Sequence, residues 1–291
     1  MQDDELLARR FEEHRPRLRA VAYRMLGSPN EAEDAVQNAW LRLNQSDSHA
    51  IDNLGGWLTT VVGRECLHLL RSRRRQREEL FDPVVHLPDP VVTAVDDDDP
   101  GQRAVLADSV SLALLMVLDS LGPAERLAFV LHDLFDVPFD EIAPLVERTP
   151  AATRQLASRA RRRVRGNEPY VPDRDRARER EVVEAFYAAV NEGDFAALLE
   201  VLDPDVVFHA DYGPGRPSTV YRGAETIARQ SQAARGAELH PVLVNGLPGV
   251  VTIRDGRPVS LMSFTVVGGR IVAIDGIRDP DRVRRITASV I

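Results

Sequence analysis

Lysine is absent from the 291-residue sequence, so all 37 basic residues are arginines with planar, permanently charged guanidinium groups. Cys66 is the single cysteine, which excludes an internal disulfide and leads us to expect a cytoplasmic protein. No run approaches the ~18 consecutive apolar residues of a membrane-spanning helix, so we expect no membrane contact. The seven histidines and one cysteine show no metal-ligand spacing, and the sequence predicts neither a metal nor a cofactor.

Acidic residues outnumber the arginines and give a net charge of −8, which by itself argues against a nucleic-acid partner. The charge is nevertheless segregated along the chain. Residues 64–77 hold six arginines against Glu65, and residues 148–165 hold seven arginines and no acid. Residues 81–109 hold seven aspartates against Arg103. Two cationic segments that flank an anionic one indicate two nucleic-acid-binding surfaces.

Hydrophobic periodicity divides the chain into three folded parts. Apolar residues recur at three- and four-residue steps from Glu5 to about Arg77 and from about Arg103 to Arg165, which predicts helices. From Arg176 a helical stripe precedes short β-rich runs with turns, which predicts an α+β unit on an antiparallel sheet. We therefore expect two all-α domains at 1–80 and 104–168, an acidic and proline-containing linker at 81–103, a second linker at 169–175, and an α+β domain at 176–291.

The segment 148–165 predicts a DNA-binding helix. On a helix that begins at Pro150, Arg154, Ser158, Arg161 and Arg165 share one side, opposite a row of apolar residues. The preceding VPFDEIAPLVE predicts a second short amphipathic helix, and together the two form a helix-turn-helix. Its second helix would place arginines and Gln155 in a major groove. The alternative is a surface helix with a solvated cationic face.

Two further helices carry distinctive surfaces. In residues 57–77, Arg64, His68, Arg71 and Arg75 lie along one edge, and Trp57 could stack on bases or belong to the core.

The helix that follows Ser28-Pro29-Asn30-Glu31, an N-cap with proline at the first helical position, is expected to show an outward stripe. The stripe consists of Asp34, Gln37, Asn38 and Leu41. An exposed leucine among polar residues suggests that it binds a protein partner.

These features, in this order, resemble extracytoplasmic-function (ECF) sigma factors of bacterial RNA polymerase over residues 5–165. SPNEAEDAVQNAWLRL is similar to the family's polymerase-binding helix, WLTTVVGRECLHLLRSRRR to its −10 helix, and the segment from LGPAERLAF to RARRRV to its −35 helix-turn-helix. VVEAFYAAVNEGDFAALLEVLDPDVVFHAD resembles the start of cone-shaped SnoaL-like (NTF2-like) domains. Sigma factors with this appendage form the sigma-J-like subgroup.

The resemblance implies partners and residue roles. The expected partners are the β′ clamp helices of core polymerase, bound by the outward stripe, and promoter DNA. The DNA-binding residues implied are Trp57, Arg64, His68, Arg71, Arg73, Arg74, Arg75, Arg154, Gln155, Ser158, Arg161, Arg162 and Arg165. Three subgroup motifs, all altered here, imply interdomain or regulatory residues: Leu87, Pro88, Asp89, Pro90, Asp211, Gly213, Gly215, Asp279, Pro280 and Asp281.

The C-terminal domain offers candidate pocket residues in His209, Asp211, Tyr212 and Asp275. His209 and Asp211 are two residues apart on a predicted strand and should face the same side. We expect a non-enzymatic, regulatory domain, and binding of a small ligand in its cone is left open. Two alternatives remain: a one-component helix-turn-helix regulator with a ligand-sensing SnoaL-like domain, and an enzyme whose N-terminal half is accessory.

The acidic segment generates a first prediction. Charge repulsion from Asp96–Asp99 acts over about a Debye length, ~8–10 Å, and should discourage DNA binding by the free protein. Replacing these four aspartates with serine should therefore raise polymerase-free DNA affinity at low salt, measured by fluorescence anisotropy. Unchanged affinity at low salt would contradict this role.

Overall fold

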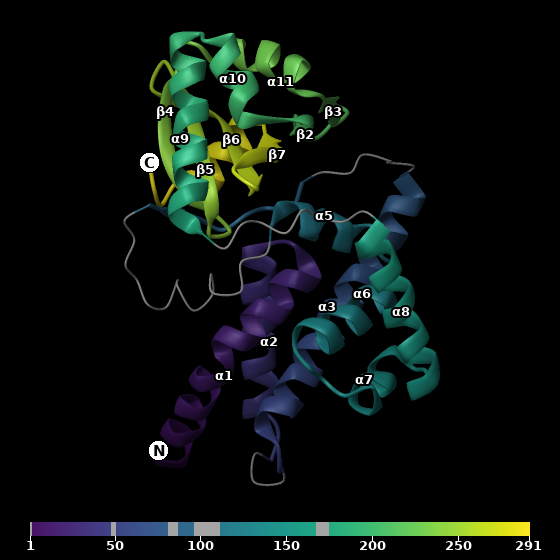
Figure 1. Ribbon diagram of the computed structural model, residues 1–291. Helices are drawn as coiled ribbons and strands as arrows, with labels where there is room; N and C mark the ends of the chain where they lie inside the picture. The colour runs from purple at the N-terminus through teal and green to yellow at the C-terminus, as the bar shows by residue number, and fades with distance from the viewer. Residues whose placement is uncertain (1, 48–50, 81–86, 96–110, 167–174) are drawn as a thin grey trace. The chain divides into compact units, whose positions relative to one another are not determined.

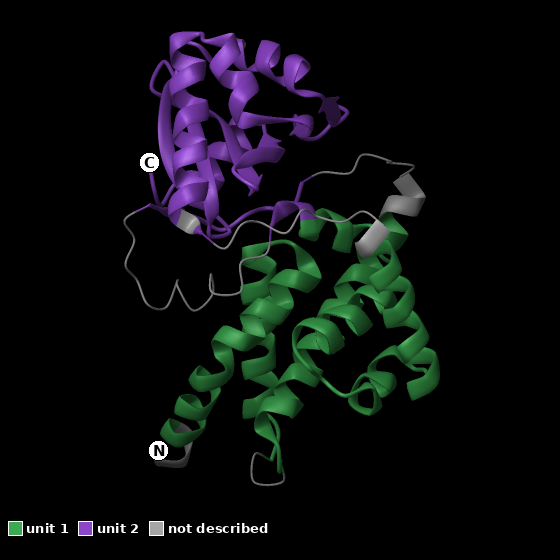
Figure 2. Cartoon of the chain, in the orientation of Figure 1, with its two compact units in different colours: residues 1–83, 100–108, 114–168 green, residues 84–99, 109–113, 169–291 purple. Residues whose placement is uncertain are grey.

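The computed structural model describes residues 2–47, 51–80, 87–95, 111–166 and 175–291. Two units divide the chain (Figures 1 and 2). The helical unit comprises 1–83, 100–108 and 114–168, and the C-terminal unit comprises 84–99, 109–113 and 169–291. Asp96–Asp99 lies outside the described residues, so its role stays a prediction. Among the described residues, no helix combines the length and apolar character that a bilayer span requires.

The first half of the helical unit is a three-helix bundle of α1 (Gln2–Leu26), α2 (Pro29–Asn44) and α3 (Leu54–Leu80). The predicted cap of α2 is confirmed, because the Ser28 side chain accepts a hydrogen bond from the Glu31 amide at 3.4 Å. The helix α3 begins at Leu54 rather than near Trp57. Its extra turn is stabilised by Asn53, whose Oδ1 accepts from the Gly56 amide at 3.0 Å.

The second half of the helical unit contains the predicted helix-turn-helix. In order, its elements are α5 (Leu112–Asp119), α6 (Pro123–Phe129), the π-helix η2 (Val130–Leu134), α7 (Phe139–Val146) and α8 (Pro150–Gly166). The helix α7 ends two residues after Pro144, and Glu147 follows with a φ of +57°. This left-handed residue turns the chain toward α8, whose first turn is capped by Thr149.

The two halves, predicted as separate domains, pack on one another in the structure. The helix α3 contacts α6 and α7, and a buried arginine of α6 reaches α1. Arg126 is 2% exposed; its Nε donates to the Arg24 carbonyl at 3.0 Å and its Nη1 to Asp119 at 3.1 Å. Burial lowers the pKa of Arg126 to about 10, and Asp119 partly offsets that shift.

The C-terminal unit is a seven-stranded mixed sheet with helices packed on it (Figure 1). The strand order is β1-β4-β5-β6-β7-β2-β3. The strands are β1 (Val92–Ala94), β2 (Leu202–Asp211), β3 (Thr219–Arg222), β4 (Glu238–Val244), β5 (Leu247–Arg254), β6 (Arg257–Val267) and β7 (Arg270–Ile277). The helical elements are α9 (Arg176–Glu192), α10 (Phe195–Val201), α11 (Ala224–Ser231), the 3-10 helix η3 (Gln232–Ala234) and α12 (Pro280–Thr287).

The predicted antiparallel sheet is confirmed at five of the six strand pairings of the described residues, and the exception is that β2 and β7 pair in parallel. The predicted hairpin turns are confirmed at Asp255-Gly256 and Gly268-Gly269, where all four residues have positive φ. The core lies between the sheet and α9, with Phe186 and Tyr187 of α9 packed against Phe264 of β6.

Part of the predicted linker 81–103 is an integral element of the C-terminal unit. Residues 87–95, which we call the strap, include β1, whose residues pair with β4. The Val91 amide donates to Asn245 Oδ1 at 2.9 Å, and the Asn245 amide donates to the Val91 carbonyl at 2.8 Å. The strap is therefore held by strand addition at the sheet edge, a non-local pairing that its sequence does not reveal.

Arg282 of α12 generates a prediction about the strap. It contacts the Leu87 carbonyl, Asp89 at 2.6 Å and Asp211 at 2.8 Å. Because Asp211 is 1% exposed, Arg282→Ala leaves a buried carboxylate without its cation, at a cost of about 3 kcal/mol. We expect faster hydrogen exchange at residues 87–95 and lower denaturant stability of the C-terminal unit.

The matched control is Arg284→Ala, on the same helix. Arg284 pairs with Asp281, and both side chains are mostly exposed, so its loss should change little. Equal hydrogen exchange at the strap in the two variants would contradict the anchoring role of Arg282.

Candidate polymerase and nucleic-acid interfaces

The outward stripe of α2 is exposed as the sequence predicts. Asp34, Gln37 and Asn38 are solvent-exposed, and Leu41 is 50% exposed although it is a large apolar residue. The opposite face of the helix, including Val36 and Leu43, is buried. An exposed leucine surrounded by hydrogen-bonding groups suits a protein partner better than a solvated surface, because burying it there gains apolar contact.

The cationic edge of α3 is also exposed. Arg64, His68, Arg71 and Arg75 all face solvent, and Trp57 is half-buried. Arg71 lies 3.8 Å from Glu147, and its side chain is 43% exposed, so this ion pair is weak and leaves the guanidinium available. The helix therefore presents a row of positive charge that can contact a nucleic-acid backbone.

Arg73 and Arg74, adjacent in sequence, differ in environment. Arg73 is half-buried, donates to the Leu26 carbonyl at 3.1 Å and pairs with Glu31. It stabilises the C-terminal end of α1, and its DNA contact stays a prediction. Arg74 is exposed. Sequence periodicity missed this difference because the partners of Arg73 come from a distant turn.

The helix α8 carries a mixture of exposed and ion-paired arginines. Arg154, Gln155, Ser158 and Arg162 are exposed, and the Arg154 guanidinium lies 5.5 Å from the centre of the Phe139 ring. Arg161 is half-buried, with its Nε 2.5 Å from Asp133. The side chain of Arg165 lies outside the described residues.

Two acidic residues of the preceding helices were not expected at this surface. Asp133 holds Arg161, and Glu125 lies 3.6 Å from Arg159 and 3.1 Å from Arg163. Their carboxylates neutralise part of the positive charge of the seven arginines in residues 148–165. The most available guanidiniums are consequently those of Arg154 and Arg162.

A small cavity of about 20 Å³ lies in the described part of the C-terminal unit, lined mainly by apolar side chains such as Phe186, Phe208 and Ile274. None of the four predicted pocket residues lines it. Because side chains alternate along a strand, His209 and Asp275 point to the sheet face opposite Phe208 and Ile274. They do not line this cavity, and a ligand site formed by His209 and Asp275 stays a prediction.

His209 and Asp275 nevertheless meet on that opposite face. They are direct partners in the parallel pairing of β2 with β7, and His209 Nδ1 lies 2.9 Å from Asp275 Oδ1. Tyr212, the remaining candidate, hydrogen-bonds Tyr221 at 3.2 Å between hydroxyl oxygens. Burial opposes its ionisation, but Tyr221 and nearby arginines lower the pKa of Tyr212 overall.

Asp211 binds the strap. Its carboxylate accepts from the amides of Leu87 at 2.7 Å and Gly213 at 2.9 Å, and from Arg282. A side chain at Gly213 would come within 2.5 Å of the Asp279 carboxylate, so glycine is required there. Asp279 caps α12 through the amides of Asp281 and Arg282.

The structure thus brings together residues from all three predicted interdomain segments, within the C-terminal unit. Leu87 and Pro90 are buried, Pro88 and Asp89 are half-buried, and Gly215, Pro280 and Asp281 are exposed. Sequence reasoning missed Arg282, which joins two of these segments. One sequence feature could have identified it, because Arg282 is the single basic residue in Asp279-Pro280-Asp281-Arg282-Val283.

Comparisons with known proteins agree with this arrangement. The Sigma-70 region 2 family matches residues 10–76, Sigma-70 region 4 matches 111–164, and the SnoaL-like domain matches 183–276. The ECF RNA polymerase sigma factor SigJ of Mycobacterium tuberculosis is 38% identical over 290 residues, covering 94% of this chain and 91% of SigJ. The chain belongs to the ECF sigma factors.

Two further comparisons describe the same family along nearly the whole chain. The probable ECF RNA polymerase sigma factor SigI of M. tuberculosis is 36% identical, covering 95% of this sigma factor and 94% of SigI. The crystal structure of M. tuberculosis SigJ has a TM-score of 0.73 and 35% identity, covering 94% of this chain and 97% of that chain. We call residues 10–76 region 2 and 111–164 region 4.

The charge environment of α8 generates a prediction for the complex of this sigma factor with polymerase and DNA. Arg162 is exposed with no ion pair among the described residues, so Arg162→Ala should remove a phosphate contact and make the slope of log K against log[salt] shallower by about one. Arg163→Ala is the matched control, since Glu125 already pairs with Arg163. Equal slopes for both variants would remove Arg162 from the interface.

Proposed function

We propose that this sigma factor directs core RNA polymerase to specific promoters through three surfaces of its helical unit, with its C-terminal domain regulating that activity. The observation that carries this proposal is that α3 and α8 each expose arginines on one side while burying an apolar side. Each helix can contact DNA without unfolding. The chain selects the start site, and the polymerase makes the phosphodiester bonds.

The α2 stripe is proposed to bind the β′ clamp helices of core polymerase. Its polar members can hydrogen-bond a helical partner, and Leu41 supplies the apolar contact. Burying an exposed leucine against a partner gains free energy from the apolar area removed from water. The stripe contains no arginine, so its affinity should depend less on salt than DNA binding does.

The two cationic helices are proposed to bind different DNA elements. In α3, Arg64, His68, Arg71, Arg74 and Arg75 would hold the −10 strand, with half-buried Trp57 near the same surface. In α8, Arg154, Gln155, Ser158 and Arg162 would bind the −35 element. Gln155 and Ser158 are the uncharged donors and acceptors there, so base selection falls mainly on them and Arg154.

The C-terminal domain is proposed to act by contact with the strap rather than by catalysis. The strap joins regions 2 and 4 in sequence, and its hydrogen bonds to Asp211, Asn245 and Arg282 fix it to this domain. The residues that line the small cavity include no carboxylate or imidazole, the usual acid–base groups. A ligand there would require side chains to move, because about 20 Å³ holds no more than a water molecule.

In vitro transcription with purified core polymerase tests this function. The wild-type chain should co-elute with the core enzyme and produce transcripts from one class of promoter. Leu41→Ala should weaken core binding about tenfold, the loss of ~1.4 kcal/mol, without changing the transcription start site. The matched control is Asn44→Ala, at an exposed position of the same helix outside the stripe.

Failure of the wild-type chain to bind core polymerase would overturn the proposal. Tight, sequence-specific duplex binding by a dimer without polymerase would instead support the one-component regulator.

A further inference from the structure

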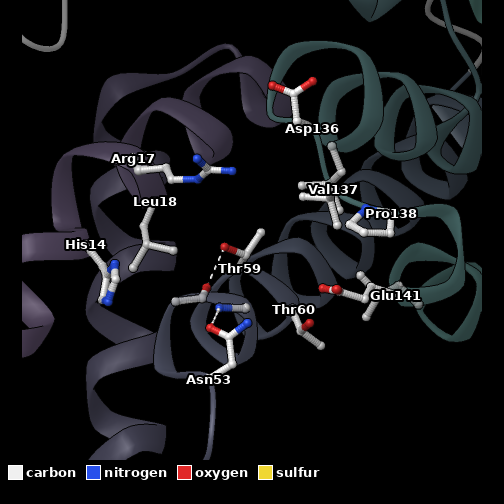
Figure 3. Close-up of a pocket in the computed structure, with 14 residues that line it drawn as sticks. His14, Arg17, Leu18, Asn53, Thr59, Thr60, Asp136, Val137, Pro138 and Glu141 are labelled. Atoms are coloured by element: carbon white, nitrogen blue, oxygen red, sulfur yellow. Dashed lines mark hydrogen bonds between the residues drawn. The ribbon is translucent and has the colours of Figure 1, made fainter.

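A pocket of about 330 Å³ opens in the helical unit (Figure 3). Its walls come from α1, from the start of α3 and from the segment that joins η2 to α7. Its volume falls within the range of ~300–1,000 Å³ that small-molecule sites occupy in proteins. None of the described residues proposed to contact polymerase or DNA lines it, so those roles do not account for the pocket.

The deepest part of the pocket is apolar. Leu18 of α1, Leu131 of η2 and Leu145 of α7 line it, and they are 1%, 0% and 5% exposed. Gly55 and Gly56, at the start of α3, add no side chains and leave the space beside these leucines open. An apolar group of a ligand would therefore lose its contact with water there, which favours binding.

Charged groups of opposite sign stand on opposite sides of the pocket. Figure 3 shows the Arg17 guanidinium of α1 and the Glu141 carboxylate of α7 extending toward the pocket from different walls. Arg17 Nη2 donates to the Phe135 carbonyl at 2.6 Å, which occupies one of the five N–H groups of the guanidinium. The other N–H groups can bind an anion.

The two charges are also unpaired within the part of the chain that the structure describes. Arg15 and Arg19, which flank Arg17 on α1, both form ion pairs with Glu33. Arg17 and Glu141 form an ion pair neither with each other nor with another described residue. A ligand that carries a negative and a positive group can pair with both, whereas water only solvates them.

We propose that this pocket binds a small zwitterion with an apolar side chain, which is the chemistry of a free apolar α-amino acid. The carboxylate of the ligand accepts hydrogen bonds from Arg17, and its ammonium group donates to Glu141. Its side chain is buried against Leu18, Leu131 and Leu145. The site is independent of the polymerase and DNA surfaces.

Polar side chains at the rim add hydrogen-bonding groups for such a ligand. The Thr60 hydroxyl lines the pocket and forms no hydrogen bond with another described residue. Asn53 uses its Oδ1 to accept from the Gly56 amide, which leaves its NH₂ group as a donor. The His14 ring packs against Gly55, where a Cβ would lie 3.0 Å from its Cε1.

Isothermal titration calorimetry of the full chain at low salt, with leucine as the probe, tests the site. Leucine should bind one site per chain with saturation at concentrations up to about 10 mM. Isocaproate lacks the ammonium group, isoamylamine lacks the carboxylate, and serine lacks the apolar side chain. Each should bind at least about tenfold more weakly than leucine, because each omits one of the three proposed contacts.

Two variants assign the contacts through opposite changes in ligand preference. Arg17→Gln should weaken leucine and isocaproate about tenfold and leave isoamylamine unchanged. Glu141→Gln should weaken leucine and isoamylamine about tenfold and leave isocaproate unchanged. Glu141 is exposed and unpaired among the described residues, so its variant should fold as the wild type does.

The matched controls are Arg19→Gln on α1 and Asp140→Asn on α7, neither of which lines the pocket. Both should bind all the probes as the wild type does. Leucine should also raise the Tm of the wild type and of both controls, and raise it less in the two pocket variants.

The proposal is overturned if leucine does not bind the wild type, or if isocaproate or isoamylamine binds as tightly as leucine. It also fails if Arg17→Gln and Glu141→Gln weaken isocaproate and isoamylamine equally, because a general distortion of the pocket would then explain the loss. None of these measurements involves polymerase or DNA, so their outcome is separate from that of the proposed function.

Discussion

Burial of the apolar side of α3 is the interaction on which the helical unit depends. Leu58, Val62, Cys66 and Leu67 of this helix are fully or almost fully buried, and the arginines that alternate with them are left at the surface. The hydrophobic effect thus orients the charges: the helix cannot bury its leucines without exposing Arg64 and Arg71. The cationic surface that we propose binds DNA results from the same pattern that forms the core.

A different interaction organises the C-terminal unit. Asp211 is a buried carboxylate, and such a group is stable only when paired and hydrogen-bonded. Arg282 and the Leu87 amide provide those partners. Because the Leu87 amide belongs to the strap, the Asp211 carboxylate has both of them only when the strap is in place. The domain therefore holds a segment that connects regions 2 and 4 in sequence, and this contact is the basis of the regulation proposed above.

Sequence patterns predicted the local features well. The N-cap at Ser28, the exposed stripe of α2, the helix-turn-helix and the hairpin at Asp255-Gly256 all depend on neighbouring residues, and the structure confirms them. Non-local features were missed for a physical reason. The strand at 92–94, the parallel pairing of β2 with β7 and the ion pairs of Arg73 and Arg161 depend on partners far away in sequence. The same reason applies to His209. The alternation of side chains along a strand predicts which residues share a face of the sheet with His209, but it does not predict which face of the sheet borders the small cavity.

Hydroxyl-radical footprinting of promoter DNA tests the central claim, that two separate cationic helices bind two separate elements only on polymerase. With core enzyme and this sigma factor, the DNA should show two protected patches about two helical turns apart, and Arg154→Ala should weaken only the upstream one. With sigma factor alone at physiological salt, neither patch should be protected. A single continuous protected site that forms without polymerase would contradict the account.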